Sequence, residues 1–514
     1  MKITLSYRTV VCLWFLVSML SGCGSEQQDA EDSGQRVTEN PAATNVRSAA
    51  TDADVATAPV PFPEGFDFPA DPAELEQAIR SRDWSSIRRH GWYLWAGINH
   101  ALADGWPVWH SWPTSSQTFV PDHERIGLAA DALAVVGHQM SLIEVNNANS
   151  PINLPGPKYP MPDFVKEKWG IDKIRDGEIF QNNGDIMIAG VIYNQAAYSW
   201  IRGQGLYLTS TLDKMQNAGT ENIQDFPSHS IVLKNMYWPV KGDGLTALPV
   251  WDPRPPQEHP KYIGYERWTR AVAIDATRNK VPAGETASVT YLHGVKEHDA
   301  TTPLGPITFT DAKVVSIENF YHRKIGKDEL DAMSPYDRAI LDSVAYWCYG
   351  REFRPNDYIA SIAMHINTKE IPEWALQSVW WHDKPDQGQY AKDRPDIPVS
   401  KAPGTWRHYL MVTSYGITAQ EDPGQPAQLP IAYNPYIELA ANHPIKTNCR
   451  NCHTRAAWPR GSHVAKGQPH SSYLAPNGPG PVAVVADDDK IFDGLMRLDF
   501  QWSMGDRAIP ADKK

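Results

Sequence analysis

Cysteine and positive charge are both scarce in this sequence. Its 514 residues include five cysteines, and 60 Asp and Glu outnumber 48 Lys and Arg, so the formal net charge is -12. Nucleic acid is therefore excluded as a main partner, because phosphate binding needs a basic field that the chain lacks. The hydrophobic fraction of 42% and the charged fraction of 21% are those of a globular protein, in which most of the 19 Trp should lie in the core.

The N-terminal region lacks an apolar run long enough to span a bilayer. Residues 10–20 form an uncharged stretch after two basic residues, with the length of a signal-peptide core. The stretch ends in Leu-Ser-Gly-Cys, which resembles the lipobox of bacterial lipoproteins. This resemblance implies that residues 1–22 are a signal peptide and that Cys23 carries the membrane lipid. The alternative is an ordinary cleaved signal with a cysteine near its end by chance.

The region after Cys23 lacks aromatic residues as far as position 61 and is rich in Glu, Asp, Ala, Thr and Ser. Such a composition cannot bury enough surface to fold, so residues 23–61 are predicted to be a lipidated tether. In lipoproteins of this type, a small residue such as Gly24 after the anchor indicates the outer membrane. We therefore expect a protein anchored on the periplasmic side, at the outer membrane.

Residues 62–430 are predicted to form a mixed α+β body with substantial antiparallel sheet, followed by a C-terminal region, residues 431–514. Capping residues and apolar residues at helical spacing predict helices that begin near 71 and cover 84–102 and 335–350. Segments rich in β-branched and aromatic residues predict strands at 230–238, 287–292, 313–317, 358–366, 374–381 and 407–413. Residues 367–370 fit a hairpin turn. Pro-rich residues 251–260 and 384–403 are expected to be long surface loops.

The strongest motif stands near the C-terminus, where Cys449 and Cys452 are followed by His453. Two thiols three positions apart project from one side of a helical turn, and the adjacent histidine lies beside them. Thr447 and Asn448 are expected to cap this turn, and Asn434 with the following proline to open a short preceding helix.

This C-x-x-C-H pattern is the haem attachment motif of c-type cytochromes. The whole chain also resembles uncharacterised bacterial c-type cytochrome proteins, around residues 374–382 and 434–458. The resemblance implies one covalent haem c on Cys449 and Cys452, with His453 as the proximal iron ligand, in a small helical C-terminal segment packed on the body. Export agrees with this, since bacteria attach haem c outside the cytoplasm.

Other uses of the two thiols remain open. A thioredoxin-like dithiol would need a βαβ context, and a disulfide between Cys449 and Cys452 would close a very small, strained loop. A zinc site could combine both with His463 and His470, although the spacing departs from the usual finger pattern. If both are thioethers, Cys348 has no disulfide partner, and its apolar helical stripe predicts an inert buried thiol.

The sixth iron ligand has several candidates. In the common cytochromes of this resemblance it is a methionine downstream of the motif, which here means Met496 or Met504, with Met504 preferred for its longer separation. Both are predicted to lie on a helix over residues 489–504. Histidines could serve as the sixth ligand instead of methionine. The candidates are His443, His463 and His470 near the motif and His322, His365 and His382 in the body.

Three functions follow from these residues. The first is electron transfer through the haem to a periplasmic redox partner. The second is a haem-dependent oxidoreductase, of peroxidase or oxygenase type, in which the body forms a substrate pocket with Tyr321, His322 and Arg323 as the distal group. The third is a non-redox binding protein with a structural zinc near its C-terminus.

Overall fold

The computed structural model describes residues 61–103, 105–121, 161–170, 188–251, 268–292, 305–333, 335–415, 432, 434–439, 448–459, 485 and 488–511. The predicted signal peptide, Cys23 and the tether up to residue 60 lie outside these ranges, as does most of the proposed loop at 251–260. Within the described ranges, no helix combines the length and apolar character needed to cross a membrane.

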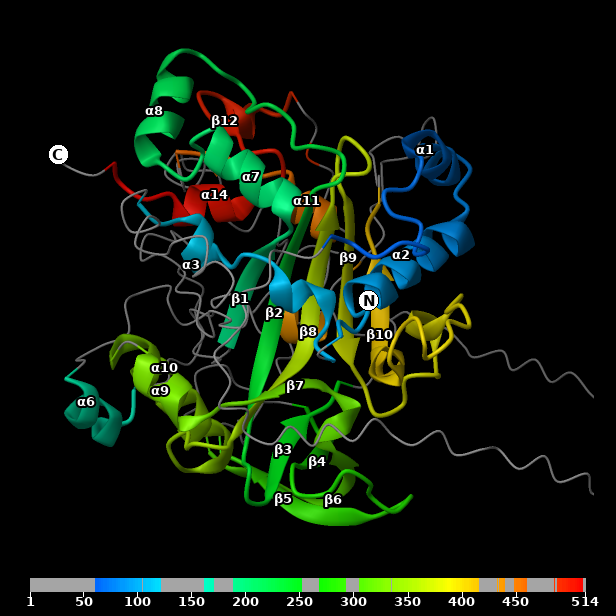
Figure 1. Ribbon diagram of the computed structural model, residues 1–514, viewed down its shortest axis with the longest axis vertical. Coiled ribbons are helices and arrows are strands. Elements are labelled where there is room, and N and C mark those ends of the chain that lie inside the picture. Colours follow the sequence, from blue (N-terminus) through cyan, green and yellow to red (C-terminus); the bar gives the residue numbers. More distant parts are fainter. Residues whose placement is uncertain are drawn as a thin grey trace, which may run out of the picture. The chain divides into compact units, whose positions relative to one another are not determined.

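The predicted α+β class is confirmed, and an antiparallel sheet of six strands dominates the described residues (Figure 1). Its strand order is β1-β2-β8-β9-β10, with β7 also paired to β8. The strands are β1 (Ile188–Tyr193), β2 (Ile231–Val240), β7 (Tyr321–Lys324), β8 (Tyr358–Thr368), β9 (Ala375–Trp381) and β10 (Tyr409–Thr413). Every one of these pairings is antiparallel, so β8 is hydrogen-bonded on both sides.

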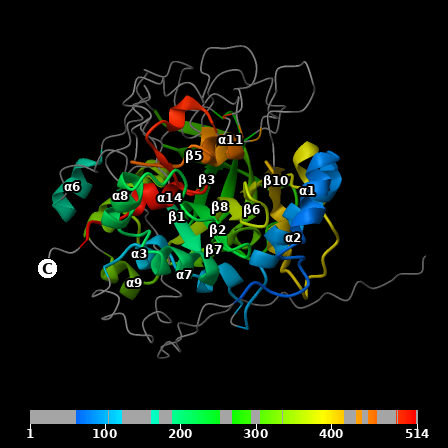
Figure 2. The ribbon, with the colours of Figure 1, turned by 90° about the horizontal axis from the view of Figure 1, so that it is seen from above.

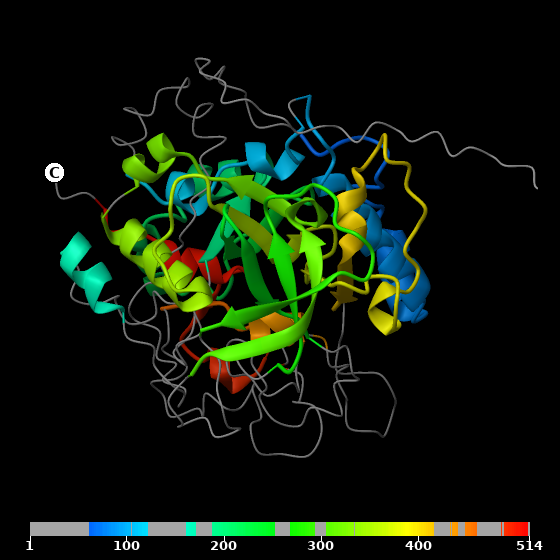
Figure 3. The same ribbon diagram turned by 90° about the horizontal axis from the view of Figure 1, so that it is seen from below.

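A second sheet of four strands has the order β3-β4-β6-β5 and is seen from below in Figure 3. Its strands are β3 (Leu245–Pro249), β4 (Ala271–Asp275), β5 (Thr286–Tyr291) and β6 (Ile307–Ser316). The parallel pairing of β4 with β6 departs from the antiparallel pattern. The predicted strand at 313–317 corresponds to the second half of β6, which begins earlier and ends at Ser316.

The predicted helices form where caps and apolar spacing agree. In α1 (Pro72–Arg80), the Asp71 side chain accepts from the Ala73 backbone and Pro72 occupies the first turn. The next two long predictions correspond to α2 (Trp84–Ile98) and α10 (Pro335–Tyr349). Helix α10 ends before Gly350, whose φ of 84° suits glycine.

The strands β8 and β9 form the predicted hairpin, with a later turn than expected. Asn367 and Thr368 still pair with Leu376 and Ala375, so the connection covers residues 369–374. Helix α2 packs near β10, and Gln377 of β9 donates to the Gly91 carbonyl of α2. One face of the sheet is therefore covered by α2.

Many tryptophans lie in the core, as the sequence predicted. The fully buried indoles are Trp92, Trp95, Trp109, Trp112, Trp238, Trp374, Trp380, Trp381 and Trp406. Each fully buried large apolar side chain stabilises the fold by about 2 kcal/mol. These tryptophans are accordingly packing residues rather than an exposed ligand surface.

A second core cluster joins the C-terminal region to the body. It contains Cys449, Met496 and Met504 together with residues of α7 (Gln195–Gly203) and α8 (Thr209–Asn217), neither of which was predicted. Val232 of β2 and Leu376 of β9 belong to the same cluster. The C-terminal region thus shares its core with the large sheet.

The predicted helix over residues 489–504 is wrong. These residues form the 3-10 turn η9 (Lys490–Phe492), the short strand β12 (Met496–Arg497) and the start of α14 (Trp502–Arg507). Strand β12 pairs with β11 (Ala457–Trp458), which follows the C-x-x-C-H motif. Asp499 and Phe500 have φ of 44° and 65°. This left-handed backbone cannot continue a right-handed helix, although the apolar residues here have helical spacing.

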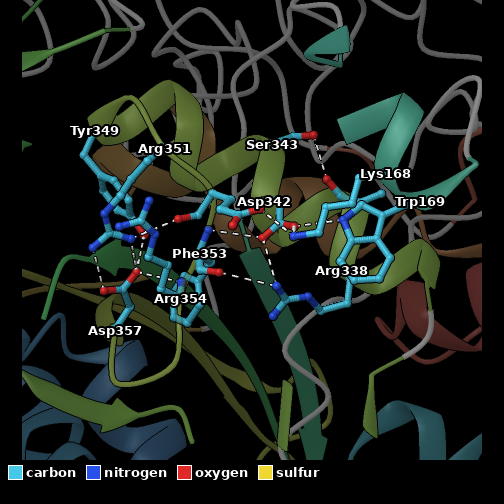
Figure 4. Close-up of polar contacts among 12 residues, drawn as sticks. Lys168, Trp169, Arg338, Asp342, Ser343, Tyr349, Arg351, Phe353, Arg354 and Asp357 are labelled. Carbon is cyan, nitrogen blue, oxygen red and sulfur yellow. Dashed lines mark hydrogen bonds and ion pairs between the residues drawn. The ribbon is translucent and has the colours of Figure 1, made fainter. Parts of the chain in front are cut away.

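Charged side chains on and around α10 form a group that we call the α10 charge network: Lys168, Arg338, Asp342, Arg351 and Asp357 (Figure 4). Asp342 accepts from the Trp169 indole at 2.8 Å and from the Phe353 backbone at 3.1 Å. Burial raises the pKa of Asp342, and the neighbouring Arg338 opposes this shift. The network ties α10 to α6 (Asp163–Trp169) and to the loop after α10.

Candidate haem-binding site

The motif residues form a short helix, α11 (Cys449–His453), which contacts β9. Of the two predicted capping residues, Asn448 caps the helix, because its side chain accepts from the Asn451 backbone at 2.9 Å; Thr447 lies outside the described residues. The Asn451 side chain in turn accepts from the Val485 backbone at 3.1 Å. Cys449 is buried and Cys452 is half-buried. Both thiols are therefore held on one turn whose start is fixed by side-chain hydrogen bonds.

The His453 ring is oriented by a backbone carbonyl. Its Nδ1 lies 2.8 Å from the carbonyl oxygen of Phe500. A carbonyl only accepts, so Nδ1 carries the proton, and in the neutral ring Nε2 then keeps its lone pair. A hydrogen bond of this kind orients a metal-binding histidine and fixes its tautomer.

The segment that supplies this carbonyl is held by a buried ion pair. Asp499 lies 2.6 Å from Lys369, and the two side chains are only 5% and 4% exposed. Asp499 also accepts from the Phe226 backbone at 3.0 Å. Left-handed residues other than glycine persist where the surroundings fix them, and these contacts fix Asp499 beside Phe500.

A second ion pair joins α11 to the turn between β8 and β9. Arg450, inside the motif, makes two hydrogen bonds to Glu373, at 2.7 and 2.9 Å. Burial raises the pKa of Asp499, which shows that placing a charge here has a desolvation cost. The hydrogen bonds between the paired side chains offset that cost. The turn at 369–374 thus contacts the motif helix through Glu373 and residue 499 through Lys369.

The sheet brings a second histidine to the motif. His365 of β8 is buried, and its ring centroid lies 6.2 Å from that of His453, with an angle of 83° between the ring planes. Its cross-strand partners are Lys234 on β2 and Ser378 on β9. Residues directly opposite one another share a face of the sheet, so all three side chains belong to the face on which α11 lies.

The chain before the motif is fixed to the same place. The predicted short helix at residue 434 is present as the π-helical turn η8 (Pro435–Leu439), which contacts β8. Asn434 is fully buried and donates to the Ser378 hydroxyl and to the Val379 carbonyl, both at 2.8 Å. Ser378 stands opposite His365, so this segment is anchored beside the second histidine.

The two predicted methionine ligands lie on different elements. Met496 is in β12 and Met504 in α14, and both are fully buried in the second core cluster with Cys449. In that cluster they pack with apolar residues such as Leu498 and Ala456. Burial among apolar side chains is the ordinary position of methionine in a core.

The other candidate histidines are distributed elsewhere. His382 lies 3.0 Å from the Trp251 carbonyl, and burial lowers its pKa. His322 pairs with Ala360, five residues before His365 along β8, a distance of about 16 Å at the rise of a strand. His443, His463 and His470 lie outside the described residues, so the predicted zinc set is described only in its two cysteines.

Two further observations concern metals and thiols. Among the described residues, no group of three or more His, Cys, Asp or Glu could hold a metal ion. Cys348 is buried on α10 as predicted, and burial raises the pKa of its thiol well above the ordinary value. A thiol in that state is a packing residue rather than a nucleophile.

The elements around the motif are seen from above in Figure 2, where α11, α8 and α14 are labelled. Both α8 and α14 contact β11, which follows α11 in the chain. No protein-family model matches this chain, nor does any curated protein or solved structure. The geometry of the described residues is therefore the basis for the function proposed below.

The sequence motif identified the two thiols and His453, while the residues that hold them lacked any signal of their own. The Phe500 carbonyl, Lys369 and Asp499 lie in no motif, and Glu373 is one acidic residue among many. His365 was one of several histidines that could reach the motif only through the fold. No local pattern on β8 distinguished it from the others.

Proposed function

We propose that this chain is a c-type cytochrome that binds one covalent haem through Cys449 and Cys452 and transfers electrons. Each thiol would add across a vinyl double bond, sulfur to one carbon and hydrogen to the other, with no net oxidation. When bound, the haem supplies an iron that accepts and releases one electron. The supporting observation is the capped motif turn, in which the His453 Nδ1 hydrogen bond fixes the tautomer whose Nε2 carries the lone pair that an iron would bind.

The chain's own residues would perform three tasks in this function. The turn from Cys449 to Cys452 would hold the haem edge, and His453 would hold one face of the iron in the orientation given by Phe500. The body would exclude water from the buried side, where Cys449 shares a core with residues of α7 and β9. A site that excludes water and keeps its ligands in fixed positions rearranges little when an electron is transferred.

Electron transfer is favoured over the oxidoreductase by the position of the proposed distal group. Tyr321 packs against Trp95 and Tyr409, and Arg323 pairs with Glu329 at 2.8 Å. Their strand, β7, meets β8 at residues 358–361 rather than at His365. An acid or base for peroxide or oxygen chemistry would have to stand beside the iron.

The location and partner belong to the same proposal. Cys23 would carry a membrane lipid on the periplasmic side, at the outer membrane, and the electron partner would be a periplasmic redox protein. Replacing Cys23 with alanine should move the protein from the membrane fraction to the soluble periplasmic fraction. A protein that stays with the membrane would contradict this anchor.

The haem itself is tested by expression with the cytochrome c assembly machinery, followed by haem staining after denaturing electrophoresis. We expect a stained band with one iron per chain and no zinc, and reversible reduction of the purified protein. The variant Cys449→Ala/Cys452→Ala should lose the stain, while Cys348→Ala, the matched control, should keep it. An unstained wild-type protein that contains zinc would overturn the proposal in favour of the zinc-binding alternative.

A further inference from the structure

We propose that His365 is the sixth ligand of the iron, so that the haem is held between the C-terminal motif and the large sheet. This inference rests on the proposed function, because it concerns the ligand opposite His453. The proposed ligand is then a histidine 88 residues before His453 in the chain, rather than Met504 or Met496. The juxtaposition of the two imidazole rings is the observation that carries it.

The separation of the rings suits two axial ligands. Two imidazoles that bind one metal ion from opposite sides, each through a bond of about 2.0 Å, have centroids roughly 6 Å apart. The centroids of His365 and His453 are 6.2 Å apart. Rings in direct contact can also be this far apart, so the number alone leaves an edge-on aromatic contact as the competing explanation.

The surroundings favour ligation over a packing contact. An edge contact between two rings stabilises the fold only weakly and does not require histidine at either position. Here one of the two rings belongs to a haem attachment motif, and its Nδ1 is already committed to the Phe500 carbonyl. A haem iron takes only two ligands from the protein, so two histidines complete it without the third ligand that a bare ion would need.

Strand β8 gives His365 a fixed position. It is hydrogen-bonded to β2 on one side and to β9 on the other, with Lys234 and Ser378 directly opposite His365. Ser378 accepts from Asn434, which anchors the segment before the motif. A ligand on a central strand is positioned more precisely than one on a loop. This suits an iron whose coordination geometry should stay the same when its charge changes.

The same geometry predicts a spectroscopic signature. The ring planes stand 83° apart, close to perpendicular. Perpendicular axial imidazoles leave the two iron orbitals that they contact nearly equal in energy, which gives the ferric ion a strongly anisotropic low-spin EPR signal. A methionine ligand would instead give the weak near-infrared absorption band of iron–sulfur ligation and a higher reduction potential.

The test compares four proteins matured with haem: wild type, His365→Ala, Met496→Leu and Met504→Leu. We expect low-spin iron without the methionine band in wild type and in both leucine variants, which keep the volume of the side chain they replace. His365→Ala should keep its covalent haem and become high-spin. Added imidazole should restore its low-spin spectrum, which shows that the variant is folded and lacks only the ligand.

The outcomes separate this inference from the proposed function. A stained, low-spin His365→Ala protein would overturn the assignment of His365 while leaving the covalent haem in place. Loss of the low-spin spectrum in Met496→Leu or Met504→Leu would overturn it in favour of methionine. Absence of covalent haem from the wild-type protein would overturn both proposals together.

Discussion

The α10 charge network and the motif site solve the burial of polar groups in opposite ways. In the network, unlike groups meet: Asp357 accepts two hydrogen bonds from Arg351, and Asp342 pairs with Arg338 at 3.3 Å (Figure 4). At the motif, two groups of the same kind meet, since His365 and His453 face one another across 6.2 Å. Opposite charges stabilise each other, whereas two imidazoles gain most from a shared metal.

The comparison distinguishes structural from functional burial. The network links α10 to neighbouring segments through ion pairs whose charges offset one another, and such pairs serve the fold. Ion pairs also surround the motif, at Lys369 with Asp499 and at Arg450 with Glu373, but they hold the backbone that orients His453. Substitutions in the network should therefore change stability and leave the haem spectrum unaltered. Substitutions around the motif can change either stability or the haem spectrum.

The largest loss of stability is expected for Asp342→Ala. This substitution leaves Arg338 buried without its carboxylate and removes the acceptor of the Trp169 indole. Breaking a buried ion pair on one side should lower the free energy of unfolding by about 4 kcal/mol. Urea denaturation measures this loss, and the haem spectrum of the folded variant should equal that of wild type. A changed iron spectrum would contradict the separation of the two regions.

A smaller loss, about 3 kcal/mol, is expected for Lys369→Met, which leaves Asp499 buried without its ammonium partner. Burial already raises the pKa of Asp499, and loss of Lys369 should raise it further. The folded state then binds a proton more tightly than the unfolded state, so stability falls as pH rises through the folded pKa.

Denaturation of Lys369→Met at several pH values tests this sign. The variant should lie closest to wild type at low pH, where Asp499 is protonated in both states, and the gap should widen toward neutral pH. A gap that is widest at low pH would show that residue 499 is not the group responsible.

Glu373→Gln should cost about 1 kcal/mol, because the Glu373 side chain is 28% exposed and its ion pair with Arg450 is partly screened by water. Haem staining should be unchanged, since neither thiol is touched. A loss of covalent haem in this variant would mean that Arg450 must be held before attachment takes place.

The smallest effect is expected at Cys348, whose thiol should be inert in the folded protein. Burial raises its pKa, so a thiol reagent should label nothing in the native haem-loaded chain. After denaturation, one thiol should react in the processed chain, because the motif thiols would be thioethers and Cys23 would be lipidated. Rapid labelling before denaturation would place Cys348 at an accessible position.

Local rules accounted for much of the fold. The cap at Asp71, the apolar stripe of α10 and the β-branched run of β8 each predicted their element from neighbouring residues alone. The prediction failed at residues 489–504, where apolar residues at helical spacing were overridden by the left-handed backbone at Asp499 and Phe500. That backbone depends on Lys369 and Phe226, which are distant in sequence.

The site divides in the same way. The C-x-x-C-H motif is contiguous, so the sequence alone is sufficient to propose Cys449, Cys452 and His453 as haem-binding residues. The ring that faces His453 comes from a strand whose position relative to α11 depends on long-range packing, and a lone histidine on β8 has no distinguishing pattern. The spacing argument that favours Met504 uses distance along the chain, whereas the proposal of His365 uses its distance from His453 in space.

Addition of carbon monoxide to the reduced, haem-loaded wild-type protein tests most directly whether both faces of the iron are occupied by the chain. The account predicts that the ferrous spectrum stays unchanged, because His453 and His365 fill both axial positions, and that His365→Ala forms the carbon monoxide complex at once. Immediate formation of that complex by the wild-type protein would contradict the account and indicate an open position of the kind that an oxidoreductase needs.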